Sequence, residues 1–266
     1  MTRQPAYAGQ FYPADKDALS DEVDKLIPKG TEKVNALGAI IPHAGYIYSG
    51  PVAGNTYARL EPKDTYIIFG PNHTGYGSRF ASSNESWDTP FGTVNINQTL
   101  LDAIKQGTSL IKDDVTAHAA EHSIEVQLPF IEKIAPSSDI VPVTVKYGGV
   151  DELYEIAEAI SNAIKGSEED VMVIASSDMT HYESRENAQK KDDMAIQKII
   201  SLDPEGLFDV VEKNDISMCG YIPSVIMLMC ACKLDAKKAD LVKYSDSGYT
   251  TGDTDQVVGY AGIVVY

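Results

Sequence analysis

Short apolar runs that alternate with longer amphipathic stretches constrain the fold of this chain more than any other feature of its sequence. Each run is five or six residues long, and two of them stop at Pro42 or at the pair Gly70-Pro71. We expect buried strands at residues 36–41, 65–69, 140–145 and 171–175. Such strands, separated by helices, are typical of a mainly parallel or mixed sheet with helices on both faces, which predicts an α/β fold.

The stretches between these strands have helical periodicity. In residues 15–27, Leu19, Val23 and Leu26 recur at the spacing of one helix face. Similar patterns predict helices at 50–60, 98–105, 121–134, 151–165, 186–201, 204–213 and 220–234, a hairpin region at 80–96 and a strand at 257–265. No segment rich in proline, glycine or serine divides the chain, so we expect residues 1–266 to form a single domain.

The composition excludes two classes of partner. A net charge of −17 gives the chain no electrostatic attraction to nucleic acid or to an anionic membrane. No apolar run approaches the roughly 18 to 20 residues that a membrane helix needs, and the N-terminal residues lack the apolar segment of a signal peptide. We therefore expect a cytoplasmic protein.

Three of the five histidines follow predicted strands. His43 comes after the first strand, His73 after the second and His181 after the fourth. Ligand sites of open α/β sheets lie outside the carboxyl ends of the strands, so we expect these imidazoles to converge on one crevice. Asp178 precedes His181 by three residues and either orients a histidine or caps the following segment.

The chain has three cysteines, of which Cys219 has the most informative position. It precedes the predicted helix 220–234, and the positive end of a helix dipole favours the thiolate, which is the metal-binding form. A thiolate with two imidazoles suits iron, copper or zinc rather than magnesium or calcium. We expect Cys230 and Cys232, inside the apolar helix, to be core residues.

A second histidine pattern indicates a different chemistry. Residues 118–122 read HAAEH, which matches the H-x-x-E-H pattern of inverted zinc peptidases. On a helix His118 and His122 would share a face, and Glu121 would be the general base. Three fixed positions arise readily by chance, so this peptidase hypothesis is the weakest of the alternatives.

Taken together, the motifs PHAGYIYSG, GPNH, EHSIEVQLPF, SSDMTHY and MCGYIP resemble, in this order, those of the Memo family. AGQFYP and WDTPFG also fit that family's pattern, so the resemblance spans nearly the whole chain. In bacteria and archaea such proteins are called AmmeMemoRadiSam system protein B. The family is similar in fold to LigB-type class III extradiol dioxygenases, which use two histidines and a carboxylate on non-haem iron.

The resemblance implies a set of site residues and partners. It implies that His43, His73 and Cys219 bind the metal, with a cysteine where the dioxygenases have a carboxylate. It places His181, His122 and Asp178 in the pocket, where they would make acid–base or substrate contacts. It also implies association with an AMMECR-type protein and a radical-SAM protein.

Three hypotheses follow for the function. The first is an oxidoreductase-like metalloprotein that uses iron or copper, or zinc, on a small molecule or a peptide. The second is a binding or adaptor protein with a vestigial dioxygenase pocket. The third is the zinc peptidase, which requires His118 as well as His122.

Overall fold

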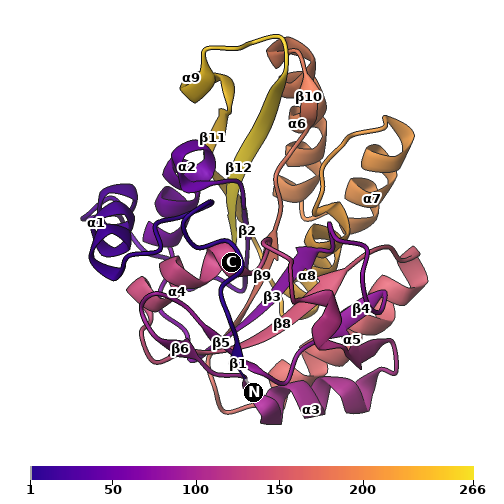
Figure 1. The fold of residues 1–266 in the computed structure, drawn as a ribbon. Helices are drawn as coiled ribbons and strands as arrows, with labels where there is room; N and C mark the ends of the chain where they lie inside the picture. Colours follow the sequence, from indigo (N-terminus) through magenta and orange to yellow (C-terminus); the bar gives the residue numbers. More distant parts are fainter. Residues whose placement is uncertain (1) are drawn as a thin grey trace.

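A computed structural model describes residues 2–266 and shows an α/β fold built on a nine-stranded mixed sheet (Figure 1). The strands lie in the order β10-β12-β2-β9-β3-β8-β4-β7, and β11 pairs with β12. Their bounds are β2 Gly38–Ile41, β3 Thr65–Pro71, β4 Phe80–Ser82, β7 Ile111–Asp113, β8 Asp139–Val145, β9 Val171–Ser176, β10 His181–Glu183, β11 Ala239–Asp246 and β12 Val257–Val265.

The four strands expected from the apolar runs form the parallel centre of this sheet. β2 pairs with β9, β9 with β3, and β3 with β8, all parallel. Apart from Asp139 at the start of β8, their residues are buried because helices cover both faces, which explains the continuous apolar runs. The antiparallel strands lie toward the edges, where β12 pairs with β2 and β4 pairs with β8. The predicted α/β fold with a mainly parallel or mixed sheet is confirmed.

Nine α-helices among the described residues surround the sheet. One core packs α1, α2 and α4 against one face, and the other packs α3, α5, α6, α7 and α8 against the opposite face (Figure 1). Neighbouring strand residues such as Ile40 and Ile41 therefore belong to different cores. The bounds are α1 Lys16–Leu26, α2 Tyr46–Ala58, α3 Gln98–Gly107, α4 Leu128–Ile134, α5 Val150–Lys165, α6 Arg185–Ile200, α7 Pro204–Lys213, α8 Tyr221–Lys233 and α9 Gly248–Thr251. Within residues 2–266, no helix has the length and apolar character needed to cross a membrane.

The predicted helix 121–134 is wrong in its first half. Residues 121–124 are not helical, a short 3-10 helix η2 spans Glu125–Gln127, and α4 starts only at Leu128. The carboxylate of Glu121 accepts hydrogen bonds from the backbone N–H of Ser123 and from Nδ1 of His73. This local bonding, which competes with helix formation, is invisible in the apolar periodicity.

The N-terminal segment is attached to the body through Arg3. Its guanidinium lies over the Trp87 ring, forms an ion pair with Glu125 at 2.7 Å, and donates to the carbonyls of His118 and Glu121. β1 (Thr2–Arg3) joins β5 (Ser86–Asp88) and β6 (Thr93–Val94) in a small second sheet, in which β5 and β6 are the antiparallel pair of the predicted hairpin region.

The contact between α1 and α2 makes a stability prediction. A Cβ added at Gly54 would overlap the carbonyl of Leu26, a backbone group that cannot rotate away. We expect Gly54→Ala to cost about 1 to 3 kcal/mol of unfolding free energy and to lower the melting temperature by roughly 3 to 10 °C in calorimetry. Gly166→Ala, where a Cβ meets nothing closer than 3.5 Å, should leave the melting temperature unchanged. Equal melting temperatures for the two variants would contradict this packing.

Candidate metal centre

The site lies at the carboxyl edge of the three central strands. His43 stands two residues beyond the end of β2, and His73 stands two residues beyond the end of β3. β9 runs between these strands and ends at Ser176, so the two histidine loops flank the last residue of β9. This is the edge at which sequence analysis expected the histidines to meet.

Three imidazoles come together at this edge: those of His43, His73 and His122. One ring nitrogen from each lies within 4.8 Å of one from each of the others, so the three form a group able to hold a metal ion. The rings of His73 and His122 stack with centroids 4.6 Å apart, and His43 stands edge-on to both at 5.3 and 5.4 Å. His122 comes from the non-helical segment before η2 rather than from a strand end.

The orientation of His73 is set by Glu121. Nδ1 of His73 lies 2.8 Å from the Glu121 carboxylate, which also accepts from the backbone N–H groups of His73 and Ser123. Burial alone would raise the pKa of Glu121, but the hydrogen bond from His73 and its other donors outweigh burial and lower the pKa to about 2. The ionised carboxylate therefore holds the proton of His73 on Nδ1 and leaves Nε2 free as a ligand.

The other two imidazoles of the cluster are neutral at physiological pH. Burial and the neighbouring His73 lower the pKa of His43 well below its usual value. Burial and the neighbouring His43 lower the pKa of His122 to about 4. A neutral imidazole is the form that binds metal, so protons do not compete for these two side chains near pH 7.

Cys219 contacts the cluster through His43. Its Sγ lies 3.3 Å from Nε2 of His43 and accepts from the backbone N–H of Asp178 at 3.3 Å. Burial and the Asp178 carboxylate raise the pKa of this thiol above its usual value, which argues against the predicted thiolate in the metal-free protein. The two cysteines of α8 also differ from each other, since Cys230 is buried as expected but Cys232 is exposed.

Asp178 and His181 lie on the Cys219 side of the pocket. The buried Asp178 accepts from the backbone N–H of His43 at 2.8 Å, so it fixes the turn that carries this histidine. His181 is half-buried, and its Nδ1 lies 2.9 Å from the carbonyl of Ser217. Burial raises the pKa of Asp178 above its usual value, although the hydrogen bond from the His43 backbone and the nearby His181 act in the opposite direction.

His118 belongs to another part of the molecule. It is 1% exposed, its Nε2 lies 2.9 Å from the carbonyl of Ala81, and its ring stands edge-on to Trp87. Residues 118–122 are not helical, so His118 and His122 do not share a helix face. The geometry that an H-x-x-E-H zinc site requires is absent from this segment.

Sequence analysis did not predict the two aromatic side chains that cover His122, which we call the aromatic wall: Phe11 and Tyr7. Phe11 packs against this imidazole with centroids 4.7 Å apart, and Tyr7 stands edge-on to both rings. Glu125 holds this wall in place by accepting from the backbone N–H groups of Ala6 and Tyr7. The motif AGQFYP was the available signal, but only the tertiary fold places it against a histidine 111 residues away.

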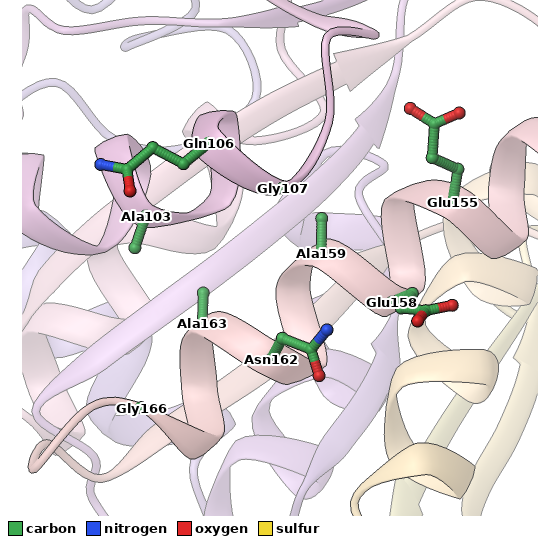
Figure 2. Close-up of a pocket in the computed structure, with 9 residues that line it drawn as sticks. All are labelled: Ala103, Gln106, Gly107, Glu155, Glu158, Ala159, Asn162, Ala163 and Gly166. Carbon is green, nitrogen blue, oxygen red and sulfur yellow. The ribbon is translucent and has the colours of Figure 1, made fainter.

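A separate hollow lies elsewhere on the molecule (Figure 2). It measures about 430 Å³ and lies between α3 and α5, which touch so closely that a Cβ at Gly107 would lie 2.8 Å from that of Ala159. Its floor is made of alanine and glycine, with two carboxylates and two amides at the sides and no histidine or cysteine. The groove therefore offers no counterpart to the chemistry of the histidine cluster.

An α/β sheet with a cluster of three histidines at the carboxyl edge of its parallel strands defines the class, an α/β protein with a metal-capable pocket. The model of the Memo-like protein family matches residues 3–264. MEMO1 family proteins of Methanosarcina acetivorans and Methanococcoides burtonii are 42% and 44% identical to this chain, which they match over 99% of its length and 98% and 99% of their own. A MEMO1 family protein of Methanopyrus kandleri is 41% identical over 99% of both chains. The chain belongs to the Memo family.

The burial of the thiols predicts the order of cysteine alkylation in the metal-free protein. With iodoacetamide at neutral pH, Cys232 should react first because it is exposed, and Cys219 should react more slowly because its raised pKa leaves little thiolate. Cys230 should stay unmodified. Mass spectrometry of the digested protein gives the order, and Cys232→Ser should remove the fast phase. Modification of Cys219 ahead of Cys232 would contradict this assignment.

Proposed function

We propose that this chain is a metalloprotein whose pocket binds iron or copper, or else zinc, and acts in an oxidoreductase-like role on a small molecule or peptide. The observation that carries the proposal is the mutual approach of His43, His73 and His122 within 4.8 Å. We also propose a fold similar to that of LigB-type dioxygenases, a single domain, a cytoplasmic location, and AMMECR-type and radical-SAM proteins as partners.

The donor set fits a transition metal. Imidazole nitrogens bound at about 2.1 Å lie at most about 4.2 Å apart, so small side-chain movements suffice to close the cluster on one ion. Imidazole and thiol donors suit iron, copper and zinc, whereas magnesium and calcium require oxygen ligands. Iron or copper in this pocket would supply one-electron chemistry or Lewis acidity.

The protein side chains have separate tasks in this proposal. His43 and His73 would hold the metal, and either Cys219 or His122 would be the third ligand. Phe11 shields the cluster from water on the His122 side. His181, half-buried at the opposite side, would exchange protons with the substrate, and Asp178 would keep the His43 turn in place.

Single substitutions test the ligand assignment. His43→Ala or His73→Ala should weaken metal binding by about 100-fold or more, because each of roughly four ligands carries about 3 kcal/mol of binding free energy. Chelator competition with Fe(II), Cu(I) and Zn(II) measures this loss. His118→Gln, whose amide can still donate to Ala81, is the matched control and should bind as the wild type does. Unchanged affinity in His43→Ala and His73→Ala would refute the proposed metal centre.

The pH dependence of metal binding identifies the third ligand. The Cys219 thiol is protonated at pH 7 because its pKa is raised, so coordination by sulfur must release a proton. With Cys219 as ligand, affinity should rise about tenfold per pH unit between pH 6 and 8, and Cys219→Ala should remove this slope. His122 is already neutral in this range, so coordination by its imidazole adds no slope.

The adaptor alternative also has support from one observation. Tyr76 and Tyr182, which follow His73 and His181 closely in sequence, are 67% and 73% exposed. Exposed aromatic side chains are enriched in protein–protein interfaces, so a partner could dock over the pocket without any chemistry taking place there. If a partner is captured equally well by the wild type and by metal-free His43→Ala, the adaptor hypothesis is favoured over the oxidoreductase-like role.

A further inference from the structure

We infer that Ser176 and Gln127 are positioning residues for the metal centre: they hold the proton of His43 on Nδ1 and so keep its Nε2 lone pair available to the metal. The inference rests on the proposed function only in naming the metal as the partner of Nε2. It rests otherwise on a closed set of hydrogen bonds behind the imidazole, all of them buried.

The hydroxyl of Ser176 has one proton and two lone pairs. Its Oγ lies 2.6 Å from the carbonyl of Ser123, an acceptor that has no proton, so the hydroxyl proton is donated there. Nε2 of Gln127 donates to the same Oγ at 2.8 Å. One lone pair remains, and it faces Nδ1 of His43 at 2.9 Å. Because Oγ can only accept from the ring, Nδ1 must carry the proton.

The amide of Gln127 has only one orientation that satisfies its neighbours. Its Nε2 lies 3.1 Å from the carbonyl of Pro42 and 3.4 Å from that of Ile41, so an oxygen at this position would face two carbonyl oxygens. Its Oε1 accepts from the hydroxyl of Tyr57 at 2.9 Å. A flipped amide would lose its bonds to both carbonyls and its donation to Ser176 inside the core, where each unsatisfied group costs free energy. The donor toward Ser176 is therefore fixed.

Both metal-facing histidines thus have the same tautomer, set by one stretch of chain. Glu121 orients His73, and Gln127, six residues later, orients His43 through Ser176. The carbonyl of Ser123, from the same stretch, takes the serine proton. The two supports differ in charge, since a carboxylate backs His73 and a neutral hydroxyl backs His43.

Histidine-selective ¹⁵N NMR of the metal-free protein tests the inference directly. In the wild type, Nδ1 of His43 should carry the proton, and Nε2 should have the shift of an unprotonated nitrogen. In Ser176→Ala, Nδ1 loses its acceptor, so the proton should move to Nε2, where Sγ of Cys219 lies 3.3 Å away to accept it. Metal affinity from chelator competition should fall about 10-fold or more.

Two further variants guard against a merely structural effect. Tyr57→Phe removes the hydrogen bond to Oε1 of Gln127 without touching a histidine. It should shift the tautomer of His43 partly toward a proton on Nε2. Ser161→Ala, a buried serine that bonds within α5, should change neither tautomer nor affinity. A proton on Nε2 in the wild type, or an unchanged tautomer in Ser176→Ala, overturns the inference. If His43→Ala keeps full metal affinity, the proposed metal centre is refuted, whereas the NMR result still tests whether Ser176 and Gln127 set the tautomer of His43.

Discussion

The buried carboxylate of Glu121 is the group on which the histidine cluster depends. It accepts from the ring of His73, from that residue's backbone N–H and from the N–H of Ser123. These bonds keep an ionised side chain stable at 0% exposure, and they bend residues 121–124 out of a helix. The bend in turn brings His122 against His73, so one carboxylate orients one imidazole and places another.

The surroundings of His43 and His122 keep these two imidazoles neutral. Burial lowers the pKa values of His43 and His122, and the rings of Phe11 and Tyr7 cover the latter. The N-terminal segment that carries these rings is attached by Arg3, which pairs with Glu125 and stacks on Trp87. The positions of Phe11 and Tyr7 therefore depend on the buried ion pair between Arg3 and Glu125, which lies at the other end of the same segment.

The sequence predicted features that depend on burial along the chain, and it failed where the outcome depends on the surroundings of a residue in the folded protein. The four central strands were evident because burial on both faces produces uninterrupted apolar runs. β11 was not predicted, because most of its residues are only half-buried and polar side chains interrupt its pattern. The thiolate expected at Cys219 was wrong because the helix-dipole argument took no account of burial or of the Asp178 carboxylate, both of which raise the pKa.

By itself, the sequence determined the α/β class, the strands that carry His43 and His73, and the edge of the sheet where these residues meet, because periodicity and chain order are local properties. Tertiary structure alone decided that His122 joins the cluster, that His118 does not, and that Glu121, Ser176 and Gln127 orient the imidazoles. The physical reason is that a hydrogen bond between side chains 48 or 133 residues apart depends on the packing of the whole fold.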